Sequence, residues 1–256
     1  MAGFKQVSLV LATAGFLTSG VAQATLIDRG HGLVYDSGLN ITWLQDANYA
    51  ALELNDARRD AIILEVGSVG GHALTRADFQ GWVLPDPYDG NMNFWGATAW
   101  AQALEFGGYS DWRLPTILQP DSSCTQQITT PPWSQGSNCA GGEMGHLFYV
   151  DLGGTFGSDK RGTQLVGDVA LYNIQANYIS GTTLPNGIGA GDFLFLNGWQ
   201  SNTLFSFPNF AWAVRDGDVE FVPEPTTLAL ICIGLAGLTA TRRKNVQTSA
   251  RRRHQA

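Results

Sequence analysis

The sequence has few charged residues, and few basic residues outside its last positions. Only 14% of the 256 residues are charged, while 11% are aromatic. Ordinary soluble domains have about 25% charged residues. Disordered chains combine high charge with few aromatics, so this composition excludes disorder. Acids outnumber bases by 22 to 15. Because this excess repels phosphate, we expect no nucleic-acid partner. The 31 glycines have no period of three, which excludes collagen.

Motifs of catalysis, phosphate binding and metal binding are also missing. No two histidines have the His-x-x-x-His spacing of a metal site, and no Gly-x-Ser-x-Gly elbow occurs. The glycine run at 153–157 lacks the lysine of a phosphate loop. We therefore expect no enzyme and no cofactor, and we expect His31, His72 and His146 to be surface or loop residues.

One turn is a weak candidate for a metal site. Asp86, Asp89 and Asn91 offer three oxygen side chains within six residues. Hard cations such as Ca²⁺ prefer oxygen ligands. A simple acidic turn is the favoured interpretation, with Ca²⁺ as the alternative.

The N-terminal segment is typical of a secretory signal peptide. It has one base, Lys5, no acid before Asp28, and an apolar run over residues 7–21. Ala22 and Ala24 give the small-x-small pattern that signal peptidase requires, so cleavage is expected before Thr25. A buried N-terminal helix is the alternative, but the segment has no polar helical face.

The C-terminal segment is typical of a short membrane anchor. Residues 226–241 are uncharged and, at 1.5 Å per residue, about 24 Å long as a helix, just short of a bilayer core of roughly 30 Å. The basic residues directly after it are Arg242, Arg243 and Lys244. They predict a cytoplasmic stop, with residues 245–256 as a basic tail. A short amphipathic core helix is the alternative, but residues 228–238 are apolar on every face.

The C-terminal arrangement closely resembles the PEP-CTERM sorting signal of Gram-negative bacteria. Pro223, Glu224 and Pro225 are followed by the apolar segment and the basic cluster, so the resemblance covers residues 222–244. It implies that an exosortase recognises the Pro-Glu-Pro motif, cuts nearby and transfers the exported part to a cell-surface or extracellular-matrix acceptor. Proteins with this signal are common in organisms that make exopolysaccharide and biofilm.

The segment between the two signals, residues 25–221, is expected to be one exported domain. Counted to residue 222, it has 21 acids and 8 bases, so its charge is 8 − 21 = −13. Such a domain should be soluble and should repel polyanions unless a cation intervenes. Its two cysteines, Cys124 and Cys139, predict a disulfide across an irregular loop. Free thiols or a reactive cysteine are the alternatives.

Helical and strand patterns both occur in this domain. We expect helices over residues 55–66, capped by Asn55, and 94–104. Ala57, Ala61, Ile62 and Leu64 or Glu65 are the expected buried face of the first helix, and Ala97, Trp100, Ala101 and Leu104 that of the second. Strands are expected over residues 32–35, 40–44, 145–151, 169–174, 192–196 and 210–214. Long loops are expected over most of 118–168. Helices early and strands late predict an α+β fold.

Three segments of the domain resemble the Lcl C-terminal domain family. They include residues 33–48, the Trp112-Arg113-Leu114-Pro115 motif with its flanks, and the closing Val-Arg-Asp-Gly at 214–217. That family is similar to C-type-lectin-like and formylglycine-generating-enzyme domains. The resemblance implies two helices, a small antiparallel sheet, paired first and last strands, and long loops that carry any ligand site. The Ca²⁺-binding triplets of lectins are absent from this sequence.

The sequence therefore predicts an exported surface or matrix protein that binds glycan, exopolysaccharide or another matrix component. Trp133 and Trp199 lie in turn-rich segments and are the candidate ligand-facing aromatics, although buried loop plugs are the favoured interpretation. Arg113 is expected to form a structural ion pair. A purely structural matrix protein and an extracellular enzyme are the other hypotheses.

Overall fold

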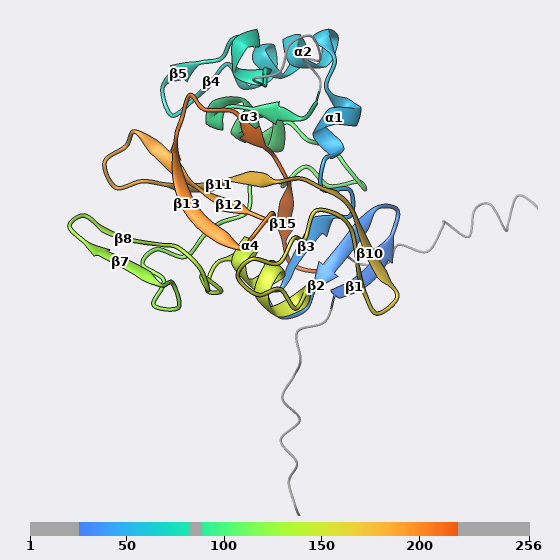
Figure 1. Ribbon diagram of the computed structural model, residues 1–256. Helices are drawn as coiled ribbons and strands as arrows, with labels where there is room; N and C mark the ends of the chain where they lie inside the picture. The colour runs from blue at the N-terminus through green and yellow to red at the C-terminus, as the bar shows by residue number, and fades with distance from the viewer. Residues whose placement is uncertain (1–25, 82–88, 220–256) are drawn as a thin grey trace, which may run out of the picture.

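Short strands dominate the structure, a computed structural model that describes residues 26–81 and 89–219 (Figure 1). One antiparallel sheet has four strands in the order β1-β2-β3-β15. Their bounds are Leu26–Gly30 for β1, Leu33–Asp36 for β2, Ile41–Leu44 for β3 and Val214–Asp216 for β15. A second sheet has five strands in the order β13-β12-β11-β14-β6. The architecture is α+β, as predicted.

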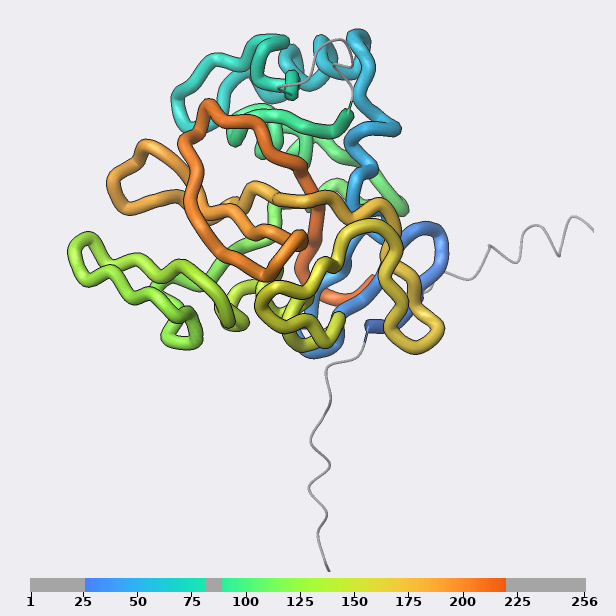
Figure 2. Tube along the Cα trace, in the orientation of Figure 1, coloured from blue at the N-terminus to red at the C-terminus, as the bar shows by residue number. Residues whose placement is uncertain are grey.

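The first sheet brings the two ends of the described chain together (Figure 2). β2 and β3 form a hairpin whose turn is closed by Asp36, because its Oδ1 accepts from the amides of Gly38 (2.9 Å) and Leu39 (3.1 Å). β15 then pairs with β3, with Val214 opposite Trp43. The last described strand therefore lies beside an early one, although its partner is β3 and not β1.

The second sheet is built mostly from the last third of the chain, where strands were expected. Its members are β6 (Asn91–Met92), β11 (Asn177–Thr183), β12 (Gly189–Leu194), β13 (Trp199–Leu204) and β14 (Asn209–Phe210). β12 pairs with β11 and β13 in antiparallel fashion, while β14 lies parallel to β11. Three two-stranded hairpins complete the strands: β4–β5 (Ser68–Val69, His72–Ala73), β7–β8 (Gln126–Thr129, Pro132–Gln135) and β9–β10 (Gly162–Val166, Val169–Ile174).

Two of the helices begin where the sequence predicted. α2 (Asp56–Val66) starts after Asn55, whose side chain accepts from the Arg58 amide. α3 (Phe94–Gln102) starts after Asn93, whose side chain accepts from the Gly96 amide. The predicted buried face of α3 is confirmed. A one-turn helix, α1 (Tyr49–Glu53), precedes α2, and all three lie together above the five-stranded sheet in Figure 1.

The predicted buried face of α2 is confirmed for Ile62 and wrong for its other members. Ala57, Ala61, Leu64 and Glu65 are exposed, and the Leu64 side chain is 88% exposed. The inward stripe is Arg59, Ile62, Ile63 and Val66, which has the i, i+3, i+4, i+7 spacing of one helical face. This stripe begins with a buried arginine. Because the prediction counted only apolar residues as buried, it missed Arg59 and placed the inward face on neighbouring positions of the helix.

The strand predicted over residues 145–151 is also wrong. This segment is α4 (Glu143–His146) followed by one π-helical turn, η2 (Leu147–Asp151). Met144, Leu147 and Phe148 all point inward, which is helical rather than strand periodicity. Gly145 permits close packing, because a Cβ there would lie 1.8 Å from the Cys139 carbonyl oxygen.

An aromatic cluster fills the space between the two sheets. Trp43 of β3 lies 4.8 Å from Trp212, measured between ring centroids, and Trp212 also packs on Tyr178 (5.3 Å) and Phe195 (5.8 Å). The four side chains are fully buried. Trp212 Nε1 donates to the Leu44 carbonyl at 2.7 Å, so the indole's polar atom is satisfied in the core.

Asp78 joins the short helix η1 (Arg76–Phe79) to the start of α3. Its buried carboxylate accepts from the Thr75 amide (2.7 Å), from Asn93 Nδ2 (2.8 Å) and from the His72 ring (3.0 Å). Burial raises the pKa of Asp78, but the hydrogen bonds from Asn93, Thr75 and His72 outweigh it, so the pKa lies below its ordinary value of 3.8.

We predict that Asp78→Asn lowers the free energy of unfolding at pH 7 by about 2 kcal/mol, because one acceptor oxygen becomes a donor in a buried network. A carboxylate with a lowered folded-state pKa stabilises the fold above pH 3.8, and this contribution disappears as the pH falls through the folded-state pKa. Denaturant unfolding between pH 2 and 7 should therefore show the gap between wild type and variant closing below pH 3.8. Asp60→Asn, in an exposed pair with Arg76, should cost less. A gap that is constant with pH would contradict the prediction.

Candidate functional site

The Trp112-Arg113-Leu114-Pro115 motif forms backbone hydrogen bonds with both sheets. The Arg113 backbone pairs with Val214 through both its amide (2.8 Å) and its carbonyl (2.9 Å). The Pro115 carbonyl accepts from the amide of Gly181 in β11. The Trp112 and Leu114 side chains are buried. The motif is therefore part of the framework between β15 and β11.

The Arg113 side chain is the centre of an ion-pair network. Its guanidinium donates to both oxygens of Glu143, at 2.9 and 2.7 Å, and also to Asp216. The hydrogen bonds to Glu143 raise the pKa of Arg113 above its already high ordinary value. Partial burial lowers this pKa, but the hydrogen bonds to Asp216 raise it further, and the net shift is upward. Glu143 in turn accepts from the Thr116 amide at 2.7 Å, so the network holds the start of α4.

We predict that Arg113→Ala destabilises the fold by about 2 kcal/mol, because it leaves the half-buried Glu143 carboxylate without its bidentate partner. Arg113→Lys should recover roughly half of the loss, since lysine keeps the charge but not the two parallel hydrogen bonds. Urea denaturation measures both. Arg161→Ala, in a local exposed pair with Asp159, is the matched control and should change little. Equal stability of wild type and Arg113→Ala would contradict this account.

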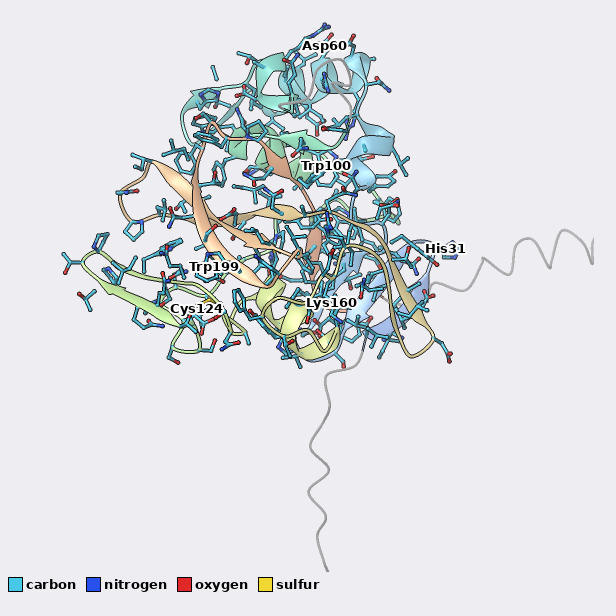
Figure 3. The ribbon with its side chains drawn as sticks, viewed as in Figure 1. His31, Asp60, Trp100, Cys124, Lys160 and Trp199 are labelled. Carbon is cyan, nitrogen blue, oxygen red and sulfur yellow. A yellow bond between two sulfur atoms is a disulfide. The ribbon has the colours of Figure 1, made fainter. Side chains whose placement is uncertain are left out.

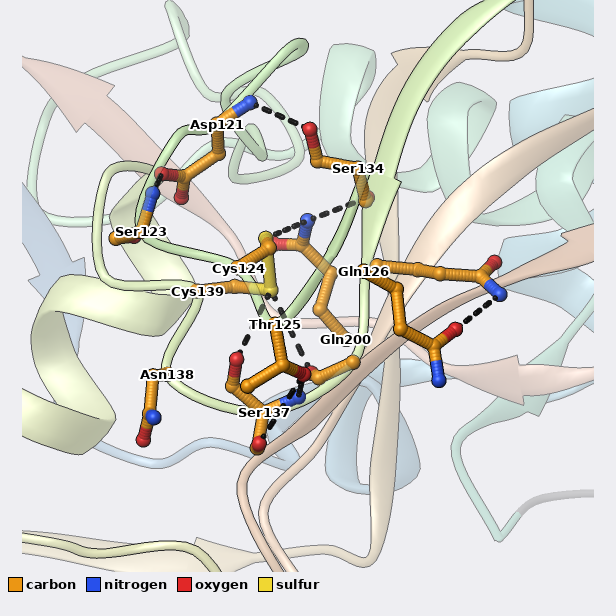
Figure 4. Close-up of a disulfide and its surroundings, with 12 residues drawn as sticks. Asp121, Ser123, Cys124, Thr125, Gln126, Ser134, Ser137, Asn138, Cys139 and Gln200 are labelled. Atoms are coloured by element: carbon orange, nitrogen blue, oxygen red, sulfur yellow. Dashed lines mark hydrogen bonds between the residues drawn. A yellow bond between two sulfur atoms is a disulfide. The ribbon is translucent and has the colours of Figure 1, made fainter. Parts of the chain in front are cut away.

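The predicted disulfide is present between Cys124 and Cys139, next to the β7–β8 hairpin (Figure 4). Gln200 of β13 reaches into this loop and donates to the Ser134 carbonyl at 3.2 Å. Trp133 is only 3% exposed. Trp133 is therefore not a ligand-facing residue, and the favoured interpretation of a buried loop plug is confirmed for it. β8 turns its ring inward, where it plugs the loop against β12 beside Gly191.

Trp199 has a different environment at the surface. It is half-buried at the start of β13, on the side of the molecule where Cys124 lies (Figure 3). Its ring packs against Phe156, which is 54% exposed, with 5.8 Å between the ring centroids. The Gly157 amide donates to the Asn197 carbonyl at 2.8 Å, which fixes the Phe156 loop against the turn before Trp199.

The turn before Trp199 depends on a glycine. Gly198 has a φ of +77°, and a Cβ there would lie 2.5 Å from the Phe148 ring. The Tyr149 hydroxyl donates to the Gly198 carbonyl and accepts from the Asn138 amide at 2.8 Å. Tyr149 thus links the disulfide loop, the π-helical turn and the base of β13, and it holds the Phe156–Trp199 pair in place.

The acidic turn suggested as a Ca²⁺ site is only partly within the described residues. Asp86 lies outside them. The Asp89 carboxylate accepts from the Asn91 amide (2.9 Å) and from Asn91 Nδ2 (3.1 Å). These two side chains therefore satisfy each other in a local turn, and Ca²⁺ binding there stays a prediction.

A cluster of three titratable side chains lies elsewhere, at residues that the sequence analysis did not single out as a site. Asp36, at the end of β2, meets His146, the last residue of α4, and Asp151, the last residue of η2. One ligand atom from each lies within 4.8 Å of the others, and His146 Nε2 is 3.7 Å from Asp151 Oδ2. The π-helical turn η2 places Asp151 beside His146, five residues earlier in the chain.

Four polar atoms of this cluster are buried without a hydrogen-bond partner. They are Asp36 Oδ2, His146 Nε2 and both carboxylate oxygens of Asp151. Burial, and then the neighbouring Asp36 carboxylate, raise the pKa of Asp151 to about 7. Buried polar groups without partners are rare, and each requires an explanation. The expectation that His146 is a plain surface or loop residue is wrong, because its side chain is only 19% exposed.

Sequence reasoning missed the cluster for a definite reason. Asp36 is more than a hundred residues from the other two, and His146 and Asp151 do not have the i, i+4 spacing of a helical metal motif. The one local signal, a helical rather than strand period over 144–148, was misinterpreted as strand.

A comparison with models of known protein families matches residues 221–244 to the PEP-CTERM protein-sorting motif. The chain thus carries the signal of an exported, transiently membrane-anchored protein that an exosortase processes. Comparisons with curated proteins and with solved structures found no match. The resemblance to the Lcl C-terminal domain gains no support from them, so the C-type-lectin-like assignment stays a prediction.

The predicted sorting segments lie outside the described residues. These are the signal peptide 1–24, the motif and apolar segment to residue 244, and the tail 245–256. Within residues 26–81 and 89–219, no helix has the length and apolar character needed to cross a bilayer.

We predict that the exported protein lacks residues 1–24 and the residues after the Pro-Glu-Pro region. Intact-mass spectrometry of protein released from the cell surface of the native host measures both ends. Replacing Pro223, Glu224 and Pro225 with alanine should yield protein that keeps its C-terminal tail. A wild-type mass that still includes residues 242–256 would contradict exosortase processing.

Proposed function

We propose that this is a non-catalytic protein of the cell surface or extracellular matrix of a Gram-negative bacterium, and that its folded part binds a neutral glycan such as an exopolysaccharide. The C-terminal motif supports the destination. The observation that carries the binding role is the pair of the exposed Phe156 and the half-buried Trp199 at the surface. The resemblance to lectin-like domains, whose loops carry the ligand site, agrees with this location.

The aromatic pair suits a sugar ring for physical reasons. Aromatic faces offer a large apolar surface at little cost in side-chain entropy, and they pack on the C–H face of a pyranose. Here the backbone contact between Gly157 and Asn197, together with the Tyr149 hydrogen bonds, holds the backbone beside both rings before any ligand arrives. Such preorganisation favours binding because less conformational freedom is lost.

The charge of the domain limits the class of glycan. Residues 25–222 carry 21 acids and 8 bases, so an anionic polysaccharide would be repelled. A neutral glycan avoids this repulsion, and an anionic one would need a bridging cation such as Ca²⁺.

We predict that Phe156→Ala combined with Trp199→Ala weakens binding to the host's exopolysaccharide at least tenfold, which is about 1.4 kcal/mol. Isothermal titration of the exported protein, with and without millimolar Ca²⁺, gives the affinities. Tyr172→Ala is the matched control, because Tyr172 is 43% exposed on β10 and is not part of the pair.

Three results would count against parts of this proposal. Unchanged affinity in the double variant would remove the aromatic pair as the site. Binding only in the presence of Ca²⁺ would indicate a cation-bridged acidic ligand. No response to any glycan of an array would favour a purely structural role in the matrix.

A further inference from the structure

We propose that Asp36, His146 and Asp151 bind one divalent transition-metal ion of the zinc type. This site is separate from the aromatic pair and does not depend on the glycan-binding proposal. Its three ligands come from β2, α4 and the π-helical turn, so an ion there would connect the first sheet to the helical segment between the two sheets.

The geometry needs only a small contraction to close around an ion. Ligand atoms at 2.0–2.2 Å from a tetrahedral zinc lie about 3.3–3.6 Å from one another. The His146 Nε2 to Asp151 Oδ2 distance is already 3.7 Å, and all three ligand atoms lie within 4.8 Å of each other. Side-chain rotations that move the ligand atoms by about 1 Å therefore suffice, with no change in the backbone.

The second observation is that the ligand atoms have no other partner. Asp36 uses Oδ1 to close its turn and leaves Oδ2 unpaired, while Asp151 leaves both oxygens unpaired in a fully buried side chain. Two carboxylates that approach each other away from water repel, and each loses solvation. A divalent cation between them satisfies the orphaned atoms and neutralises both charges.

The donor set selects the class of ion. Ca²⁺ and Mg²⁺ take oxygen ligands, whereas an imidazole nitrogen favours zinc and its neighbours in the transition series. Two carboxylates and one histidine leave a fourth tetrahedral position.

The experiment uses the full chain, purified in detergent micelles, stripped with a chelator and dialysed. Titration with Zn²⁺ should show one ion per chain with a dissociation constant in the micromolar range or tighter. Thermal unfolding should shift upward by about 5 °C or more at saturation. Co²⁺ at the same site should give the visible absorption of a tetrahedral complex. Ca²⁺ and Mg²⁺ should bind at least a hundredfold more weakly than Zn²⁺.

Two variants separate metal binding from folding. Asp151→Asn and His146→Gln should each weaken Zn²⁺ binding at least a hundredfold and abolish the thermal shift. Asp151→Asn should leave the metal-free protein at least as stable as wild type, because it replaces a buried carboxyl group whose two oxygens have no hydrogen-bond partner. A variant that is folded and stable but no longer binds zinc therefore identifies Asp151 as a ligand.

His31→Asn is the matched control, because His31 is an exposed histidine with a φ of 52° that asparagine also adopts. It should bind Zn²⁺ like wild type. The proposal is overturned if the stripped wild type binds no Zn²⁺, if binding survives in Asp151→Asn and His146→Gln, or if Ca²⁺ binds as tightly as Zn²⁺. In the first case the two carboxyl groups share a proton instead.

Discussion

Trp43 and Trp212 lie in contact at the centre of the molecule, and the fold depends on that contact. The two residues are 169 positions apart, yet their rings are 4.8 Å apart and Trp212 donates to the carbonyl of Leu44. The residues just after Trp212 form β15, which completes the first sheet against β3. Tyr178 and Phe195 extend the same cluster into the second sheet. Burying four large aromatic side chains contributes several kcal/mol.

Arg113 stabilises the same region, the junction of the two sheets at Trp43 and Trp212, through polar contacts. Its backbone extends the pairing of β15, and its guanidinium connects Asp216 in that strand to Glu143 at the start of α4. The position of α4 then decides where His146 and Asp151 lie. The candidate metal cluster and the Phe156–Trp199 pair are therefore both positioned by this junction, although they are separate sites. An exported protein that meets variable conditions outside the cell gains from such anchoring, with the Cys124–Cys139 disulfide closing the neighbouring loop.

Several features could be predicted because their signals are local. Asn55 and Asn93 cap helices through contacts within three residues, and the β2–β3 hairpin depends on the Asp36 turn. Predictions failed where a distant partner decided the outcome. Leu64 was assigned to the core of α2 and is exposed, because a buried Arg59 begins the true inward stripe. For Trp133 the sequence left a ligand-facing and a buried interpretation open, and the packing of β8 against the second sheet decided for the buried one.

The sequence by itself determined the destination of this protein, since a sorting signal is a contiguous segment read by a processing enzyme. It also determined the α+β class and the cysteine pair, which follow from local periodicity and from the even number of cysteines in the exported domain. Only the tertiary structure brought Asp36 to His146 and Asp151, and Phe156 to Trp199. These groupings depend on strand pairing and packing between residues far apart in the chain, and no local pattern of residue types records such contacts.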